Sequence, residues 1–478
     1  MNYNIVFSTD DATVVTEYKP EYRSDGLGYQ SEDSLEKDFI RLLTEQGYEY
    51  INITKEADLI NNLRTQMEKL NNIAFSDNEW ECFFNESLAS SQEGILEKTK
   101  KIQLEHVQLL KRDDGTTKNI YLIDKKAIHN NRLQIINQYE QEEGKYKNRY
   151  DVTILVNGLP LIHIELKRRG VEIREAFNQI NRYQRDSFWA STGLFEYVQI
   201  FVISNGTNTK YYSNTTRNEL LKDSNKNKKG ALHSFEFTSF WADSNNKVIL
   251  DLTDFTKTFF AKHTVLNILT KYCVFTSDES LLVMRPYQIA ATEMILRQIK
   301  ISTNYKTMGS SDAGGYIWHT TGSGKTLTSF KTAILATELP SIDKVIFVVD
   351  RKDLDYQTKK EYDRYQEGAA NGNTSTKILQ RQLENKNKYG GYEDFKIIVT
   401  TIQKLNVFIK NNKKHDIYTK HVVIIFDECH RSQFGEMHKA IIDKFKRYHI
   451  FGFTGTPIFA ANAPSARKSP TFTTEQVF

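Results

Sequence analysis

Cysteine is scarce in this chain, in which Cys82, Cys273 and Cys429 lie far apart with no Cys-x-x-Cys or Cys/His ligand spacing. This scarcity excludes a disulfide framework and argues against a structural zinc site. No apolar run reaches the roughly 20 residues that span a bilayer. The N-terminus lacks a basic region followed by an apolar stretch. The sequence therefore predicts a cytoplasmic protein without a membrane partner.

Charge of one sign is also lacking, because 64 lysines and arginines are nearly balanced by 60 acidic residues. The net charge of +4 is too small to indicate nucleic acid binding, so that function has to be inferred from motifs. Apolar residues make up 39% of the chain and aromatic residues 12%, which argues against general disorder. A chain of 478 residues with this composition is expected to form at least two domains.

The first half of the chain has the pattern of an α/β domain with a mixed sheet. An apolar stripe predicts a helix over residues 31–47, and residues 59–90 are also expected to be largely helical. Strands are expected around the turn within residues 103–123. Residues 150–203 predict strand, turn, strand, helix and strand in that order. We interpret residues 1–255 as one domain.

The second half alternates short apolar runs with helical segments, which is typical of a doubly wound parallel sheet. The runs begin near Tyr316, and each is nearly continuous, as expected of buried parallel strands. Residues 256–460 are therefore predicted to form a second α/β domain. Residues 461–478 have the composition of a linker.

The segment HTTGSGKT, residues 319–326, has the composition of a phosphate-binding loop between a strand and a helix. The backbone N–H groups of such a loop and the positive end of the helix face polyphosphate. Lys325 is expected to reach the β- and γ-phosphates, and the Thr326 hydroxyl to bind Mg²⁺. His319 occupies the position of the first glycine in the strict motif, so the match is incomplete. The candidate ATP-binding residues of the loop are Thr321, Gly322, Ser323, Gly324, Lys325 and Thr326.

An acidic pair, Asp427 and Glu428, follows a later apolar strand of the same series. Such a pair holds Mg²⁺ and polarises the attacking water in ATP hydrolysis. Taken alone, the pair is equally compatible with a solvated strand end. Its place downstream of a phosphate loop favours Asp427 as a metal and nucleotide ligand and Glu428 as a catalytic residue.

Two further segments, RPYQ (285–288) and TGTP (454–457), complete an ordered set with the phosphate loop and DECH (427–430). Over residues 285–457 these motifs resemble the first, RecA-like lobe of superfamily 2 helicases. The resemblance implies that Gln288 reads adenine, that DECH is the Walker B box, and that TGTP couples the ATP state to DNA.

Two more implications come from this resemblance. His430 and Arg431, which follow the acidic pair, are candidate motif members. Helicases of this superfamily also close ATP between two lobes, and the residues after Pro457 leave no room for a second lobe. The chain is therefore expected to be part of a longer protein.

Upstream of the motor motifs, the segment YDVTILVNGLPLIHIELK places Asp151, Glu165 and Lys167 on two adjoining strands. This combination suits a Mg²⁺-dependent nuclease, because carboxylates hold hard cations and a lysine steadies charge on a phosphate. Glu165 and Lys167 are two apart in a strand and therefore share a face. Asp151 and Glu165 are the candidate metal ligands. Taken alone, the pattern is more often an amphipathic hairpin with a solvated polar face.

Two neighbouring features favour the nuclease interpretation. Gln179 and Tyr183 lie one helical turn apart after the second strand. They resemble the QxxxY element of RecB-type nucleases, which belong to the PD-(D/E)xK class. Glu36 on the first helix is a candidate acidic neighbour, and His163 is expected to be a neighbour rather than a ligand.

Together these features resemble the restriction (R) subunit of type I restriction enzymes over essentially the whole chain. The resemblance implies an ATP-dependent translocase and Mg²⁺-dependent endonuclease that cuts unmethylated double-stranded DNA away from its recognition site. By the same resemblance, Asp151, Glu165 and Lys167 are the cleavage residues. Gln179 and Tyr183 would position DNA or the active site. Methyltransferase and specificity subunits would be the partners that read the site.

Two other functions stay open on the residues alone. A standalone superfamily 2 helicase would carry an N-terminal domain that binds DNA without cutting it. A non-catalytic scaffold would retain inactive motifs. A type III restriction subunit fits less well, because its nuclease follows the motor.

The register of the hairpin decides whether the proposed metal ligands meet. Turn statistics favour a two-residue loop at Asn157-Gly158, but unbulged pairing from that loop would put Asp151 and Glu165 on opposite faces. A three-residue loop, Val156 to Gly158, would set Asp151 opposite His163 and on the face of Glu165. The binary pattern favours the same face, so we predict the three-residue loop.

Overall fold

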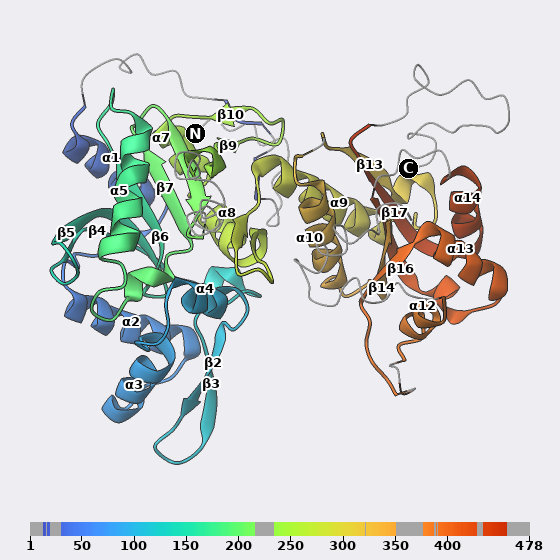
Figure 1. Cartoon of the computed structure of the whole chain (residues 1–478), viewed down its shortest axis with the longest axis horizontal. Coiled ribbons are helices and arrows are strands. Elements are labelled where there is room, and N and C mark those ends of the chain that lie inside the picture. The colour runs from blue at the N-terminus through green and yellow to red at the C-terminus, as the bar shows by residue number, and fades with distance from the viewer. Residues whose placement is uncertain are drawn as a thin grey trace, which may run out of the picture. The chain divides into compact units, whose positions relative to one another are not determined.

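The computed structural model describes residues 13–15, 17–19, 30–215, 234–320, 322–349, 376–386, 389, 391–427 and 434–456. The chain divides into two compact units, Met1–Tyr287 and Gln288–Phe478 (Figure 1). The expected boundary at 255/256 falls within helix α7 (Leu252–Thr258), which packs on α1 (Glu32–Glu45) of the first unit. Just after α7, Phe260 meets Phe39 edge-on, with ring centroids 5.6 Å apart. This aromatic packing carries the first unit beyond the expected boundary.

A six-stranded mixed sheet, in the order β1-β4-β5-β6-β7-β8, forms the centre of the first unit. The β1/β4 and β6/β7 pairs are parallel and the other neighbours antiparallel. Helix α5 packs on β6 and β7. The strands are β1 (Glu49–Tyr50), β4 (Leu133–Gln141), β5 (Asn148–Val156), β6 (Leu159–Leu166), β7 (Ile200–Ser204) and β8 (Thr209–Ser213), and α5 spans Ile173–Asp186. The strand, turn, strand, helix and strand expected over 150–203 are confirmed.

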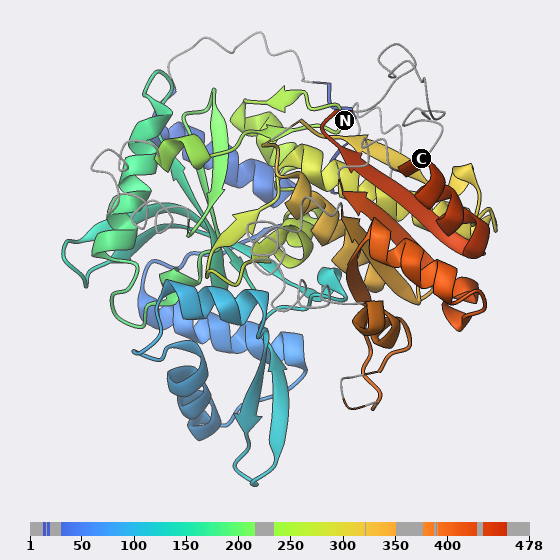
Figure 2. The same ribbon diagram turned by 45° about the vertical axis from the view of Figure 1, so that its right-hand side comes forward.

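Around this sheet lie helices and a projecting hairpin. The remaining helices of the unit include α2 (Glu56–Asn71), α3 (Asp77–Phe83), α4 (Ile95–Gln103) and α8 (Lys262–Asn267). The strands expected within residues 103–123 are confirmed as the hairpin β2 (Val107–Lys111) and β3 (Thr117–Tyr121). This hairpin extends away from the sheet in both views (Figures 1 and 2). Short two-stranded sheets join β9 (Trp241–Ala242) to β10 (Val248–Ile249) and β11 (Cys273–Phe275) to β12 (Leu281–Val283). No helix among the described residues is both long enough and apolar enough to cross a bilayer.

The β5–β6 hairpin corrects the predicted loop. Val156 pairs with Leu159, so the loop is the two-residue Asn157-Gly158, and both of these residues have positive φ (+52° and +84°), as a type I′ turn requires. The three-residue loop was wrong. A β-bulge between Ile154 and Leu155 then shifts the pairing by one residue.

Beyond the bulge, Val152 pairs with Ile164, and one more step along the same register places Asp151 opposite Glu165. The predicted partner of Asp151, His163, was therefore wrong by two residues. The shared face was right, because a shift of two residues keeps every side chain on its face. The hairpin thus has the turn that its sequence favours, and the bulge returns Asp151 and Glu165 to the same face of the sheet.

Gly158 provides a test of how tightly this turn is seated. A Cβ at Gly158 would lie 2.7 Å from Leu63 Cα of α2, a backbone atom that cannot move aside without the helix. Gly115 has almost the same φ (+81°), but a Cβ there meets nothing within 4 Å. Gly115→Ala should therefore lower the free energy of unfolding by about 1 kcal/mol, the cost of the left-handed conformation alone. Gly158→Ala should lower it by about 1 to 3 kcal/mol more, because of the clash with α2. Denaturant unfolding of both variants measures this difference, and equal losses would contradict it.

A five-stranded parallel sheet, in the order β13-β17-β16-β14-β15, forms the centre of the second unit. The strands are β13 (Gly315–Trp318), β14 (Lys344–Val349), β15 (Ile397–Thr401), β16 (His421–Asp427) and β17 (Arg447–Thr454). The helices are α9 (Pro286–Asn304), α10 (Lys325–Thr337), α12 (Thr376–Leu383), α13 (Ile402–Asn411) and α14 (Phe434–Lys444). The predicted parallel sheet is confirmed. The segment expected to be a linker, 461–478, lies outside the described residues.

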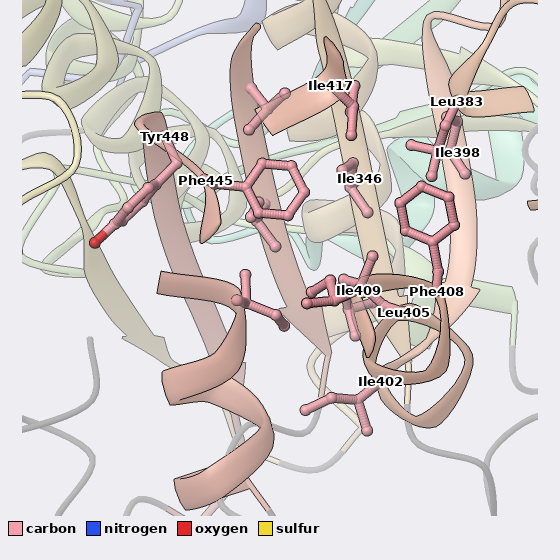
Figure 3. Packing of buried hydrophobic residues seen from close by; sticks show 14 of the residues in the cluster. Ile346, Leu383, Ile398, Ile402, Leu405, Phe408, Ile409, Ile417, Phe445 and Tyr448 are labelled. Carbon is pink, nitrogen blue, oxygen red and sulfur yellow. The ribbon is translucent and has the colours of Figure 1, made fainter. Parts of the chain in front are cut away.

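Alternate residues of each strand enter different cores, which is why the strand sequences are continuously apolar. Ile346 of β14 and Ile398 of β15 pack on one face against α12, α13 and α14, where Phe408 lies beside Ile398 (Figure 3). Val345 and Phe347 pack on the other face against α9 and α10. The sheet is therefore the middle of three layers, and its strand ends are left free to carry polar groups.

Candidate functional site

Asp151, Glu165 and Lys167 meet at the end of the β5–β6 hairpin. Lys167 Nζ donates to Glu165 Oε1 at 3.0 Å and to the Leu166 carbonyl at 3.0 Å. Asp151 Oδ2 accepts a 2.9 Å hydrogen bond from the Leu166 N–H. The lysine and both carboxyl groups are thus brought to one place, with Glu165 fully buried and the Lys167 side chain 12% exposed.

Burial dominates the electrostatics of this group. It raises the pKa of Asp151 above its usual range, and the charge of Glu165 adds to the rise. It also raises the pKa of Glu165, against the lowering effect of Lys167. Glu165 Oε2 is buried and accepts no hydrogen bond. Two crowded carboxylates, one with an unsatisfied oxygen, are suited to a hard divalent cation, which would neutralise them.

Two more side chains lie beside these carboxylates. His163 Nε2 is 3.5 Å from Glu165 Oε2, and His163 Nδ1 is 3.1 Å from the Thr153 hydroxyl. Burial lowers the pKa of His163 to about 4, so it is neutral at physiological pH. It lies beside Glu165, and its role as a neighbour rather than a ligand stays a prediction. Among the described residues, no group of three or more His, Cys, Asp and Glu side chains is arranged to hold a metal.

The amides around Glu36 were not foreseen from the sequence. Asn137 and Gln138 donate to its two carboxylate oxygens. Their only sequence signal is a pair of adjacent amides in a strand that contains other polar residues as well, which is too common a pattern to single out.

Gln179 and Tyr183 tie helix α5 to the strand that carries Asp151. Gln179 Nε2 donates to the Tyr183 hydroxyl at 2.5 Å, and that hydroxyl donates to the Arg149 carbonyl at 3.0 Å. Arg149 lies two residues before Asp151 in β5. This chain of hydrogen bonds favours the second of the two predicted roles, positioning of the active site, over contact with DNA.

The phosphate loop follows β13 and leads directly into α10. Gly322 and Gly324 have φ of +80° and +75°, conformations that glycine adopts without strain. Gly324 precedes the first residue of α10, Lys325, so Lys325 and Thr326 stand at the helix N-terminus. His319 continues the β13–β17 pairing through its N–H, which donates to the Thr454 carbonyl at 2.9 Å. Its use as a strand residue explains why glycine is not required there.

Gln288 contacts the phosphate loop itself. Its Nε2 donates to the carbonyls of Ser323 and Gly324 at 3.0 and 3.3 Å. A Cβ at Gly324 would lie 2.5 Å from this amide nitrogen. In this structure Gln288 therefore stabilises the loop through its backbone carbonyls. Recognition of adenine by Gln288 stays a prediction.

Asp427 and Thr454, from two other predicted motifs, lie at the same edge of the sheet as the loop. Asp427 ends β16 and pairs with Phe453, and the next residue of β17, Thr454, pairs with Trp318 of β13. Because the strands are parallel, their carboxyl ends lie along one edge of the sheet. Ligands bind at this edge in sheets of this kind. The predicted residues Thr321, Glu428, His430, Arg431 and Pro457 lie outside the described residues.

Two family models match the two units in turn. The model described as the N terminus of type I restriction enzyme R proteins matches residues 29–220. The model of the SWI2/SNF2 ATPase matches residues 287–477. The first match contains the carboxylate group of the hairpin, and the second contains the phosphate loop.

Curated relatives extend these matches. The chain is 48% identical over 298 residues to the EcoprrI type I restriction enzyme endonuclease subunit of Escherichia coli, covering 62% of this chain and 91% of that protein. It is 41% identical over 442 residues to a type I restriction enzyme endonuclease subunit of Staphylococcus saprophyticus, covering 91% of this chain and 43% of that protein. A counterpart in Staphylococcus aureus is 39% identical over 445 residues, with 91% and 44% covered. The chain therefore spans less than half the length of these staphylococcal relatives.

Proposed function

The chain belongs to the endonuclease subunits of type I restriction enzymes, and on that basis we propose that it combines an ATP-dependent DNA motor with a Mg²⁺-dependent nuclease. The substrate is unmethylated double-stranded DNA, cut away from its recognition site. The partners are methyltransferase and specificity subunits, which read the site, and the compartment is the cytoplasm. One observation carries the proposal: a lysine–carboxylate group built on the buried Glu165, one of whose oxygens is unsatisfied, occurs in the same chain as a phosphate loop.

In the nuclease unit, which we assign to the PD-(D/E)xK class, Asp151 and Glu165 would hold the Mg²⁺ ion. When bound, Mg²⁺ supplies a Lewis acid for the scissile phosphate and lowers the pKa of water. Lys167, which already donates to Glu165, steadies the negative charge that develops on the phosphate. Gln179 and Tyr183 keep the Asp151 strand in place through the Arg149 carbonyl.

In the motor unit, the backbone N–H groups at the start of α10 face the nucleotide phosphates, and Lys325 reaches the β- and γ-phosphates. Thr326 and Asp427 would hold the Mg²⁺ of the nucleotide, and Glu428 would orient water. Gln288 is assigned to the adenine, and Thr321, Gly322, Ser323 and Gly324 to the phosphates. Thr454 to Thr456 connect the nucleotide edge to DNA.

A cleavage assay in the complex reconstituted with methyltransferase and specificity subunits tests the proposal. Unmethylated circular DNA should be cut only when ATP and Mg²⁺ are both present, and fully methylated DNA should stay intact. Linearisation at full rate without ATP would contradict the coupling of the motor to the nuclease. A helicase with a non-cleaving N-terminal domain would leave the DNA uncut under every condition.

A further inference from the structure

A strained residue lies in β4, the strand beside the one that carries Asp151. Gln138 has a φ of +52°, a left-handed conformation that residues with a Cβ rarely adopt. The residues on both sides of Gln138 pair with β5 in one constant register, so neither strand has an inserted residue there. That register places Gln138 opposite Asp151. Backbone strain of this kind is concentrated at functional sites.

Gln138 and the preceding Asn137 hold the same carboxylate. Asn137 Nδ2 donates to Glu36 Oε1 at 2.6 Å, and Gln138 Nε2 donates to Glu36 Oε2 at 2.5 Å. Consecutive side chains of a regular strand point to opposite faces, so two neighbours reach one carboxylate only where the backbone departs from that conformation. The left-handed Gln138 provides this departure. Asn137 is itself fixed by the Tyr50 hydroxyl, which donates to its Oδ1 at 2.9 Å.

Glu36, on α1, is held beside the nuclease residues. It is buried, with 8% of its surface exposed. Burial raises the pKa of Glu36, the two amide hydrogen bonds lower it, and the charge of Asp151 adds to the rise. Gln138, which the register places opposite Asp151, donates to Glu36, so this hydrogen bond holds Glu36 beside the Asp151 position of the sheet. The two amides therefore offset part of the cost of burying one acid next to another.

We propose that Asn137 and Gln138, which we call the amide clamp, are positioning residues that hold Glu36 as a third acidic group for a divalent cation bound at Asp151 and Glu165. The inference rests on the proposed nuclease function. Each Glu36 oxygen already accepts an amide hydrogen bond, so Glu36 accepts from a water molecule of the hydrated cation instead of binding the cation directly. Mg²⁺ keeps several of its waters in protein sites, so such an acceptor has a partner.

Mn²⁺ binding to the 478-residue chain without DNA, measured by calorimetry, tests the clamp. Gln138→Gly removes the amide and also relieves the left-handed strain. Its Mn²⁺ affinity should fall about 10- to 100-fold, as when an outer partner of a metal site is removed. Its thermal unfolding midpoint should not fall, because glycine adopts this φ without cost. Glu36→Gln should show the same loss of affinity. Gln141→Met is the control, because it removes another amide of β4, one that donates to the Ser191 hydroxyl. This variant should bind Mn²⁺ with the affinity of the wild type.

A loss of Mn²⁺ affinity without a loss of thermal stability distinguishes a positioning role from a structural one. Wild-type affinity in Gln138→Gly and Glu36→Gln would overturn the clamp, and so would a fall in both affinity and unfolding midpoint in Gln138→Gly. Glu165→Gln distinguishes this failure from that of the nuclease. If Glu165→Gln loses Mn²⁺ binding and the other two variants keep it, the clamp alone fails. If the wild type binds no Mn²⁺, or Glu165→Gln binds it as well as the wild type, the nuclease proposal fails too.

Discussion

Replacement of Glu165 by glutamine is expected to reduce DNA cleavage about 10³-fold or more and to leave ATP hydrolysis unchanged. A metal ligand that stabilises charge on the phosphate contributes several kcal/mol to the transition state, and each 1.4 kcal/mol or so corresponds to a factor of ten in rate. The substitution keeps the shape of the side chain but removes the charge. Nicking and linearisation of unmethylated DNA by the reconstituted complex measure the loss.

The stability of the same variant provides an independent readout. Glu165 is buried beside Asp151, and the two carboxyl groups disfavour each other's charge. Glu165→Gln should therefore unfold at the same temperature as the wild type or at a higher one, as is usual when a strained active-site group is removed. Glu140→Gln, an exposed glutamate of β4, is the matched control and should cut DNA normally. Normal cutting by Glu165→Gln would refute the assignment of Glu165 as a metal ligand.

Replacement of Lys325 by alanine is expected to abolish motor-dependent cleavage. Loss of one preorganised donor to a developing negative charge typically costs about 10²- to 10³-fold in rate. In the proposed function, DNA cutting away from the site depends on ATP hydrolysis. ATPase and cleavage assays on the reconstituted complex measure both losses. Lys331→Ala makes the same charge change later in α10 and should keep both activities.

The nuclease unit should be unaffected by this change, since Lys325 belongs to the other compact unit and independent sites act additively. Mn²⁺ binding by the Lys325→Ala chain should therefore equal that of the wild type. If Lys325→Ala still cut unmethylated DNA far from its site at the normal rate, translocation would not be required for cleavage.

The hairpin shows what could be predicted from the sequence and what could not. Turn chemistry at Asn157-Gly158 and the apolar pattern of the strands are both local properties, and each was correct. The two properties predicted different registers, because both registers were inferred by counting residues from the turn with regular, unbulged pairing. The bulge that reconciles them has no sequence signal of its own, since several residues near the turn could equally be the unpaired one. The predicted loop was therefore wrong although the predicted face was right.

The strand order and the amide clamp are harder to predict from the sequence. Continuous apolar runs predicted parallel strands, because both faces of such a sheet are covered. Asn137 and Gln138 matter only because helix α1 brings Glu36 over them, 101 and 102 residues away along the chain. Contacts of that range depend on packing of whole elements, which local propensity does not describe.

The extra residue of the hairpin makes the nuclease site sensitive to the number of residues in it. Leu155 pairs with Pro160 and Ile154 with Ile162, so Leu161 is the residue without a partner across the hairpin. Deleting this one residue would remove the bulge and leave Asp151 opposite Glu165 in uninterrupted pairing. A one-residue deletion that kept the bulge would instead carry Glu165 and Lys167 to the other side of the sheet. Insertions and deletions in this segment should therefore be tolerated during evolution in twos, or one at a time only together with the gain or loss of a bulge.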